Sequence, residues 1–337
     1  MPDAAIETQQ LSKAFAGHMA VDGLSLCVPK GSVFGFLGPN GAGKTTTLRM
    51  LVGLARPTSG RATVLGQDIL RPPADPRQSY LRRIGFLPDV PEFYSWMRAG
   101  EFLTLAGQIF GLSGRNLRLR VEEVLQLTGL AGVKTRIGGF SRGMKQRLGL
   151  AQALINKPEL LFLDEPTSAL DPMGRKETLE AIAALAGQTT IFFSTHILSD
   201  AERVCDTVAI LNKGRLVTQQ SIRSLRQSHA SHWAYLEVEG GQDGRDFIAA
   251  IRSQPWVDRV EVYQQGWRVL PRDLATAQHQ LPALLAAHNL ALRRFELREP
   301  SLEDIFVELI HGKPSPQGVA EPDAAGRDAN GRQEDGR

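Results

Sequence analysis

The stretch VFGFLGPNGAGKTT, residues 33–46, decides how this sequence is interpreted. Its first five residues are apolar or glycine and are typical of a buried strand. They pass directly into a glycine-rich loop, which leads into the helical pattern of residues 46–50. The segment from Gly38 to Thr45 has the spacing G-x-x-x-x-G-K-[ST] in the strand–loop–helix context that the motif requires. We therefore expect an α/β fold with this loop at the edge of a sheet.

The loop has the chemistry of a phosphate-binding site. Its glycines let several backbone N–H groups point inward, and the N-terminus of the following helix adds partial positive charge. We expect Lys44 to reach the β- and γ-phosphates of a nucleotide and the hydroxyl of Thr45 to bind Mg²⁺. The alternative is a chance glycine-rich turn, which the flanking strand and helix disfavour. The predicted nucleotide-binding residues of the loop are Gly38, Pro39, Asn40, Gly41, Ala42, Gly43, Lys44, Thr45 and Thr46.

Two more apolar runs end in residues that are able to do chemistry. Residues 160–163 are followed by Asp164 and Glu165, and residues 190–193 are followed by Ser194, Thr195 and His196. Both runs have the length and composition of buried strands. Open parallel sheets bind their ligands at the C-terminal ends of the strands, so we expect these side chains to converge on the glycine-rich loop.

The acidic pair and the histidine suit phosphate chemistry. We expect Asp164 to hold the Mg²⁺ shell and Glu165 to act as the general base that polarises the attacking water. The alternative for the pair is a strand end exposed to solvent, and the upstream loop argues against it. A lone histidine is more often structural, but the place of His196 at a strand end favours a contact with the γ-phosphate.

The composition is that of an ordinary globular protein. Of 337 residues, 42% are hydrophobic and 22% charged, and the net charge of +3 is too small to indicate a nucleic-acid partner. Cys27 and Cys205 predict two small buried thiols in a reducing compartment. The first residues lack the features of a signal peptide, and no apolar run reaches the roughly 18–20 residues that cross a bilayer. We therefore expect a cytoplasmic protein, to which another chain supplies any transport pathway.

The chain divides into two predicted units, residues 4–217 and residues 218–311. The first alternates short strands with amphipathic stretches and contains a helical insert at about residues 93–155. The second reads β-α-β-β-α-β, with strands at 235–239, 257–263, 267–270 and 290–297, helices at 247–253 and 274–287, and Gln265-Gly266 at the central hairpin. Residues 312–337 are rich in Pro, Gly, Asp, Arg and Ala, which predicts a disordered tail.

Upstream of the acidic pair, residues 140–147 read Phe-Ser-Arg-Gly-Met-Lys-Gln-Arg. Together with the motifs above, this segment resembles the signature motif of the ATP-binding-cassette (ABC) ATPases. Ser141 is placed to cap the helix of residues 143–153, and a capped helix N-terminus beside glycine is an anion site. The resemblance implies that this site closes on the γ-phosphate held by a second subunit, so that two cassettes sandwich two ATP molecules. The residues implied in this contact in trans are Ser141, Arg142, Gly143 and Met144.

The resemblance covers about residues 6–217. Residues 168–171 resemble the loop that crosses the dimer interface, and His196 resembles the switch histidine. Phe15 stands where the family places an aromatic ring against adenine, and the alternative is a core residue. Two positions depart from the family, because Arg142 replaces the usual glycine and Asp89 replaces a glutamine that senses magnesium and water. Asp89 differs from glutamine in length and charge, so its role in the Mg²⁺ site stays open.

Two further segments bear on the partners. Residues 299–306, Glu-Pro-Ser-Leu-Glu-Asp-Ile-Phe, resemble the C-terminal extension of cassettes that pair with type-2 exporters; the alternative is an amphipathic helix, capped by Ser301, that packs back on the main body. Residues 91–97 include Phe93, Tyr94 and Trp96, and in the family a cleft beside this region receives a short helix from the membrane subunit. The alternative for these aromatic residues is the core of the helical insert.

The sequence thus predicts an α/β fold, a P-loop NTPase cassette of the ABC type with a helical subdomain, followed by a small α+β domain. The resemblance implies the ATP-binding and ATP-hydrolysing subunit of a type-2 exporter, with ATP and Mg²⁺ as cofactors. Its expected partners are an integral membrane permease and a second cassette, in a homodimer or a heterodimer, at the cytoplasmic face of the membrane. No nucleic acid is expected.

Two other functions stay open at this point. One is a soluble, non-transport cassette ATPase that acts on a macromolecular complex, and the single Gly-Lys-Thr and the lack of a long heptad run argue against it. The other is a nucleotide-binding regulator that does not hydrolyse ATP. The presence of both Glu165 and His196 argues against that function.

Overall fold

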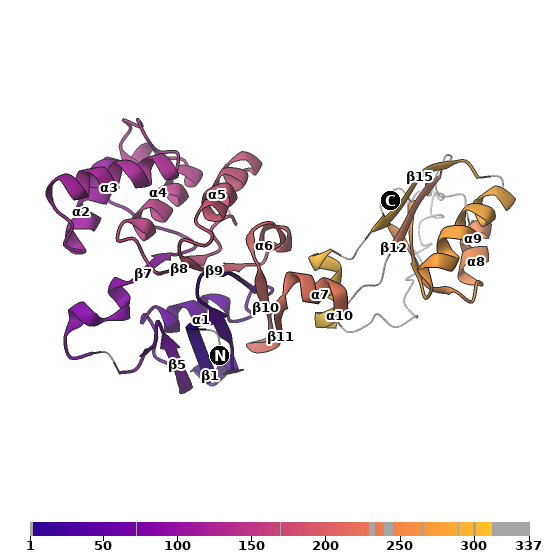
Figure 1. Ribbon diagram of the computed structural model, residues 1–337, viewed down its shortest axis with the longest axis horizontal. Helices are drawn as coiled ribbons and strands as arrows, with labels where there is room; N and C mark the ends of the chain where they lie inside the picture. The colour runs from indigo at the N-terminus through magenta and orange to yellow at the C-terminus, as the bar shows by residue number, and fades with distance from the viewer. Residues whose placement is uncertain are drawn as a thin grey trace, which may run out of the picture.

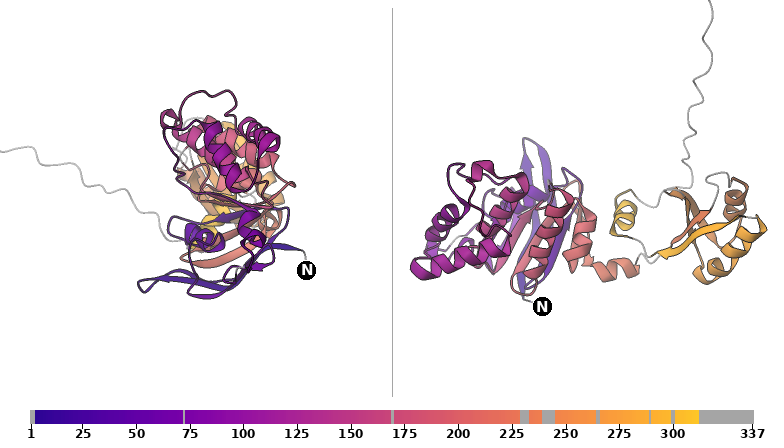
Figure 2. Two further views of the ribbon diagram at one scale, coloured as in Figure 1. Left: turned by 90° about the vertical axis from the view of Figure 1, so that its left-hand side faces the viewer. Right: turned by 90° about the horizontal axis from the view of Figure 1, so that it is seen from above.

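The structure is a computed structural model, shown in Figure 1 and from two further sides in Figure 2. It describes residues 3–71, 73–168, 170–228, 233–238, 245–263, 266–288, 290–298 and 301–311. The predicted disordered tail, residues 312–337, lies outside the described residues, as do Ala169, Gln265, Glu299 and Pro300 of the segments quoted above.

Six strands form a central sheet that is parallel except at one edge. Their order is β11 (Arg215–Ser221), β10 (Thr207–Asn212), β4 (Val33–Leu37), β9 (Thr190–Thr195), β8 (Leu160–Asp164) and β7 (Ile84–Leu87). The edge strand β11 pairs antiparallel with β10. The three strands predicted from apolar runs are confirmed as β4, β8 and β9, and the last two extend into the polar residues that follow each run.

Both faces of this sheet are buried, which explains the unbroken apolar runs. In β4, Val33 and Leu37 belong to one hydrophobic cluster, whereas Phe34 and Phe36 belong to another. Side chains alternate between the faces of a strand, so a strand covered on both sides is apolar at successive positions.

A second, antiparallel sheet covers the face that Phe36 occupies. Its order is β2 (His18–Leu24), β1 (Ala4–Phe15), β5 (Ser59–Val64) and β6 (Gln67–Asp68), with β3 (Cys27–Pro29) paired to β1. Ile6 and Val64 of this sheet share a buried cluster with Phe36. Helix α1 (Lys44–Leu51) adds Leu48 to the same cluster. The short 3-10 helices η1 (Pro76–Gln78) and η2 (Tyr80–Arg82) lead from β6 to β7.

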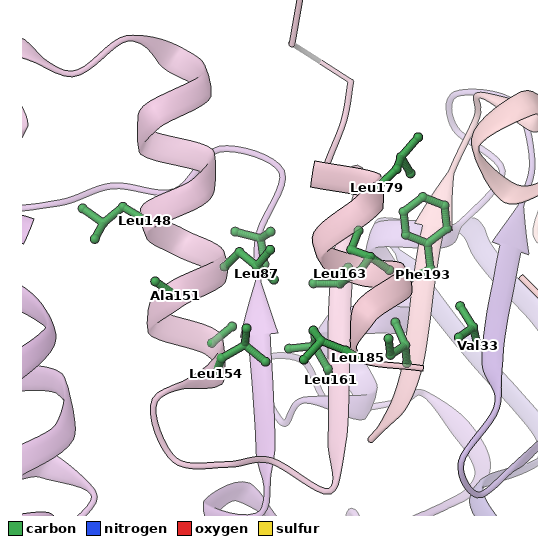
Figure 3. Packing of buried hydrophobic residues seen from close by; sticks show 14 of the residues in the cluster. Val33, Leu87, Leu148, Ala151, Leu154, Leu161, Leu163, Leu179, Leu185 and Phe193 are labelled. Carbon is green, nitrogen blue, oxygen red and sulfur yellow. The ribbon is translucent and has the colours of Figure 1, made fainter. Parts of the chain in front are cut away.

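Helices cover the opposite face. The helices on this side are α2 (Ala99–Ile109), α3 (Gly114–Leu127), α4 (Arg142–Leu154), α5 (Pro172–Ala184) and α6 (Leu198–Val204), with the 3-10 helix η3 (Ile137–Gly139) before α4. Of these, α2 and α3 pack against each other and against α4. In Figure 3, Leu87 of β7 lies between α4 and the β8 side chains Leu161 and Leu163, and α5 lies beyond them. The predicted helical insert is therefore present, and α4 within it packs directly on the edge of the sheet.

A four-stranded sheet follows in the C-terminal part of the chain, on the right in Figure 1. Its elements are β12 (Trp233–Val238), α8 (Arg245–Arg252), β13 (Val257–Tyr263), β14 (Gly266–Pro271), α9 (Leu274–Ala287) and β15 (Leu292–Arg298). The strand order is β13-β14-β12-β15, and every pair is antiparallel. The predicted order β-α-β-β-α-β is confirmed, and Phe247 and Leu281 of the two helices share a separate core with the sheet.

Two helices join this part to the body of the chain. α7 (Ile222–Ser228) and α10 (Leu302–His311) lie between the two sheets in Figure 1, and Leu225 and Leu302 are buried in the same cluster as α4 and α5. The backbone N–H of Asp304 donates to the Ser301 hydroxyl at 3.2 Å, which caps α10. The expectation that a helix capped by Ser301 packs back on the main body is confirmed. Residue 217, the predicted boundary, lies within β11.

Two expectations from composition have different outcomes. Of the helices in the described part of the chain, none is long and apolar enough to cross a membrane. Cys27 and Cys205 are free thiols of intermediate exposure, so the expectation that both are buried is wrong. Cys27 begins the short strand β3, whereas Cys205 directly follows α6 and packs against the main hydrophobic cluster beside Gly35 of β4.

The contact between α4 and β7 gives a test of the packing. A Cβ atom added at Gly85 would lie 2.0 Å from the carbonyl oxygen of Ala153, a backbone atom that cannot rotate away. We expect Gly85→Ala to lower the free energy of unfolding by about 1–3 kcal/mol or more, as overpacked cores do. In the matched control Gly100→Ala, the added carbon meets nothing within 4 Å, and we expect equal or slightly higher stability. Equal urea midpoints for Gly85→Ala and the unmodified protein would contradict the close packing of α4.

Candidate active site

The predicted site residues meet where β4, β8 and β9 end. These strands are parallel neighbours, and their register places Leu37 opposite Thr195 and Asp164 opposite Ser194. The glycine-rich loop follows β4, the acidic pair ends β8, and His196 follows β9. The convergence predicted from the three strand ends is therefore confirmed.

Glycine is required in the loop at Gly43, which immediately precedes α1. Its φ is +103°, and a Cβ atom there would lie 2.4 Å from the carbonyl oxygen of Ala20. Only a residue without a side chain adopts this conformation and tolerates this approach. The loop is thus held against the β2 strand, and the first backbone N–H groups of α1 remain available to an anion.

The side chain of Lys44 lies inside the site, and the residue is only 6% exposed. Its ammonium group donates to the carbonyl oxygen of Gly38 at 2.8 Å and lies 3.1 Å from Oε1 of Glu165. A cation at the base of a loop that also carries inward N–H groups suits the terminal phosphates of a nucleotide. The structure thus brings the lysine of the loop and the predicted general base into direct contact.

Asp164 is 2% exposed and is held by hydroxyl groups. Ser194 Oγ donates to Asp164 Oδ1 at 2.7 Å, and Thr45 Oγ1 donates to the same oxygen at 3.3 Å. Burial raises the pKa of the Asp164 carboxyl, whereas these two hydrogen bonds favour its charged form. The predicted pair of Mg²⁺ residues, Thr45 and Asp164, is therefore in contact through oxygen atoms.

Glu165 and His196 form a hydrogen-bonded pair. Oε2 of Glu165 lies 2.8 Å from Nδ1 of His196, and the backbone N–H of His196 donates to the same carboxylate oxygen at 3.3 Å. Glu165 is 8% exposed and has φ of +47°, a left-handed conformation that non-glycine residues seldom adopt. Strained backbone of this kind is common at functional sites, where the surrounding contacts enforce it.

Phe15 ends β1 and is 52% exposed, so the alternative that it belongs to the core is wrong. The ammonium of Lys13 lies 4.9 Å from the centre of its ring. An exposed ring flanked by a cation is able to stack on a flat aromatic ligand.

The signature segment begins α4. Ser141 accepts a hydrogen bond from the backbone N–H of Met144 at 3.2 Å, which confirms the predicted cap. Arg142 is exposed and lines a cleft of about 570 Å³, together with Asp89, Phe93 and other residues. Among the described residues, no hydrogen bond or ion pair links residues 141–144 to the phosphate loop of the same chain. These residues are thus not part of the cluster formed by Lys44 and Glu165.

The aromatic residues of the insert divide into two kinds. The Phe93 ring packs edge-on against Phe102, with centroids 5.1 Å apart, and is partly buried. Tyr94 and Trp96 are 49% and 64% exposed, with their rings 5.0 Å apart. The alternative that these aromatic residues belong to the core of the helical insert is therefore confirmed for Phe93 and wrong for Tyr94 and Trp96.

Sequence reasoning placed Ser194 at the site without assigning it a partner, and it missed Asp200. Ser194 donates to the buried Asp164 carboxylate. The sequence signal for this role was the position of a hydroxyl residue at the C-terminal end of an apolar strand. Asp200, 2% exposed, accepts from Thr167 Oγ1 at 2.6 Å and pairs with Arg175 at 2.6 Å. Nothing in the local sequence distinguishes Asp200 from a surface helix residue.

Comparisons with known proteins agree with this geometry. The family described as "ABC transporter" matches residues 21–168, and the family described as "ATP-binding protein DrrA1-3-like, C-terminal domain" matches residues 221–310. The "Uncharacterized ABC transporter ATP-binding protein YxlF" of Bacillus subtilis is 40% identical over 307 residues, which are 91% of this chain and 99% of that protein. The "Bacitracin transport ATP-binding protein BcrA" of Bacillus licheniformis is 39% identical over 310 residues, 91% of this chain and 97% of that protein.

A solved structure agrees as well. The "Structure of ATP binding subunit of ABC transporter" has a TM-score of 0.60 and 29% identity over 66% of this chain and 92% of that chain. These findings favour transport over the soluble, non-transport alternative. The chain belongs to the ABC transporter ATP-binding proteins and is an ATP-binding and ATP-hydrolysing subunit of an ABC transporter.

Proposed function

We propose that the chain is the motor subunit of a type-2 exporter, in which closure of two cassettes on ATP drives a separate integral membrane permease. The observation that supports the motor role is the chain of contacts that runs from the buried Lys44 to the buried Glu165 and from Glu165 to His196. The DrrA-like match of residues 221–310 and the transport name of the bacitracin relative support the exporter class. ATP turnover that rises when the permease is added would test the coupling.

The loop from Gly38 to Thr46 would hold the phosphates, and Phe15 would stack on adenine. In the structure both oxygens of the Glu165 carboxylate are engaged, one by Lys44 and one by His196. Arrival of the terminal phosphates offers Lys44 a stronger anionic partner, so its ammonium would leave Glu165. The freed oxygen of Glu165 would then accept a proton from water as that water attacks the γ-phosphorus and ADP departs.

His196 would complete this arrangement. Its Nδ1 contacts Glu165, and no described residue hydrogen-bonds its other ring nitrogen, which would therefore face the γ-phosphate. The contact with Glu165 also fixes the orientation of the imidazole. Histidine and glutamate would therefore act as one unit, with the glutamate as the proton acceptor.

The oxygen atoms near Thr45 suit Mg²⁺. The Thr45 hydroxyl and the Asp164 carboxylate are hard donors that already lie in contact with each other. This pair would supply one hydroxyl and one carboxylate oxygen to the ion. Such a site suits Mg²⁺, which keeps several waters and shares its shell with nucleotide phosphates, whose charge it neutralises.

Ser141, Arg142, Gly143 and Met144 would act on the nucleotide of a second cassette. They begin a capped helix and are separate from the phosphate loop of their own chain. A helix N-terminus carries partial positive charge, which suits a γ-phosphate brought to it by a partner. The chain would therefore hydrolyse ATP as a homodimer or as a heterodimer of cassettes.

The permease would dock on the helical insert, at the cytoplasmic face of the membrane. The exposed rings of Tyr94 and Trp96 stand beside the cleft that Phe93 and Arg142 line. Exposed aromatic pairs next to a cleft are typical of partner surfaces.

We also propose that the C-terminal part of the chain folds as its own unit, because its four-stranded sheet has a separate hydrophobic core. The first unit extends past the predicted boundary at residue 217, because β11 continues to Ser221.

The role of Lys44 is tested by Lys44→Ala. The substitution removes the point charge aimed at the phosphates, so we expect affinity for ATP to fall at least tenfold, roughly the worth of a hydrogen bond to a charged group. Arg49→Ala is the matched control, because Arg49 is an exposed cation on the same helix. Isothermal titration with ATP measures both. Unchanged affinity in Lys44→Ala would remove this lysine from the phosphate site.

The role of Glu165 is tested by Glu165→Gln. Glutamine keeps the shape but accepts no proton, so we expect ATP to bind while hydrolysis slows by about 100-fold or more. An ATP-bound dimer should then accumulate, visible by size-exclusion chromatography with ATP and Mg²⁺. The control Glu180→Gln changes an exposed carboxylate on α5 and should leave turnover unchanged. Near-normal hydrolysis by Glu165→Gln would rule out the general base.

The docking surface is tested by the double change Tyr94→Ser and Trp96→Ser. Because both rings are exposed, we expect the melting temperature and ATP binding to be retained. Loss of aromatic anchors typically costs about 2 kcal/mol or more in an interface, so co-sedimentation with membranes that contain the permease should be lost. Ile109→Ser is the control, because Ile109 is 72% exposed at the end of α2. A stable double variant that still co-sediments would place the docking surface elsewhere.

A further inference from the structure

The ring of Phe15 lies at the tip of the hairpin that β1 and β2 form. Phe15 pairs with His18 across a two-residue turn. The same hairpin adjoins the phosphate loop, because the carbonyl oxygen of Ala20 lies against Gly43. The Phe15 side chain is 52% exposed, so burial in a core does not fix its orientation. The direction in which the ring faces therefore depends on specific contacts.

Lys13 supplies such a contact. Its ammonium group lies over the Phe15 ring, 4.9 Å from the ring centre, and donates a hydrogen bond to the carbonyl oxygen of Arg56 at 2.7 Å. Arg56 belongs to the segment that follows α1. This segment is tied to β1 a second time, because the backbone N–H of Ala14 donates to Thr58 Oγ1 at 3.0 Å. The ammonium of Lys13 is therefore held in place over one face of the ring.

The position of this cation limits how a ligand can use the ring. A cation is attracted to the face of an aromatic ring by the negative charge of that face. A phenyl ring has two such faces, and the ammonium of Lys13 occupies one of them. A purine stacks on a ring with its own plane against one face, so it needs the other face of Phe15. Because the contact with Lys13 already restricts the ring, fewer orientations are lost when a base binds.

We propose that Lys13 is a positioning residue for the nucleotide base, which orients the Phe15 ring and leaves one face of the ring for a purine. This inference rests on the proposed stacking of Phe15 on adenine. Lys13 acts through the ring, whereas Lys44 and the loop bind the phosphates. Loss of the Lys13 ammonium therefore weakens the contribution of the base to affinity, which raises the KM for ATP and leaves kcat unchanged.

The test compares the affinity for ATP with the affinity for inorganic tripolyphosphate, which has phosphates but no base, both with Mg²⁺ and by isothermal titration. We expect Lys13→Met to lower the ratio of the two affinities about two- to fivefold, the size of a cation–π contact at an exposed site. Lys13→Arg keeps a cation over the ring and should retain the ratio. Lys134→Met is the matched control, because Lys134 is an exposed cation of the helical insert. Steady-state hydrolysis by Lys13→Met should show the same factor in KM.

Phe15→Leu distinguishes the roles that Lys13 could have. Once the ring is removed, Lys13→Met should have no further effect on the ratio. An equal effect with and without the ring would mean that Lys13 only supports the hairpin, and equal losses of affinity for ATP and tripolyphosphate would mean that it binds phosphate. Either result overturns the inference, as does a ratio that falls in Phe15→Leu but not in Lys13→Met. An unchanged ratio in Phe15→Leu overturns the proposed stacking on adenine, and this inference with it. Melting temperatures establish that each variant is folded.

Discussion

The ammonium group of Lys44 is almost fully buried, and the rest of the site is arranged around that charge. An ion taken out of water costs several kcal/mol unless close partners replace its hydration. Lys44 finds these partners in the carbonyl oxygen of Gly38 and in Glu165, at 2.8 and 3.1 Å. The pair is stable without nucleotide, yet either member left alone would be an uncompensated buried charge. In the proposed mechanism, phosphates that bind Lys44 would release Glu165 to accept a proton from water, so that nucleotide binding and the start of hydrolysis would be connected.

The parallel register of β4, β9 and β8 makes this contact possible. Thr45 and Asp164, 119 residues apart, meet because β9 lies between β4 and β8, with Leu37 opposite Thr195 and Asp164 opposite Ser194. Aromatic rings in the core stabilise the register of these three strands. Phe192 of β9 packs against Phe34 of β4 and Phe162 of β8, with ring centroids 5.6 and 5.7 Å apart. The chemistry at the edge thus depends on a core that contains no polar group of the site.

Much of this arrangement was predictable because it is local. The run of residues 33–37 and the glycine spacing after it identify β4 and the loop, and alternation of apolar residues identifies the C-terminal strands. The predicted boundary at residue 217 ends β11 too early, because residues 218–220 are polar and do not resemble a buried strand. An antiparallel edge strand tolerates such polar residues. The exposure of Tyr94 and the burial of Phe93 were not predictable, because an irregular loop has no periodicity. The contact of Asp89 with Ser168 was not predictable either, since it joins residues 79 positions apart.

Asp200 connects the loops around the site to one another. Its carboxylate is 2% exposed and is held by Thr167, which follows Glu165, and by Arg175 of α5. Asp200 lies on α6, four residues after His196, so the segments that carry Glu165 and His196 are held to each other behind the site. Breaking one partner would leave a buried carboxylate unsatisfied, which makes the link costly to open. The segment that follows Glu165, the start of α5 and the start of α6 are therefore held to one another through a single buried carboxylate, behind the hydrogen bond between Glu165 and His196.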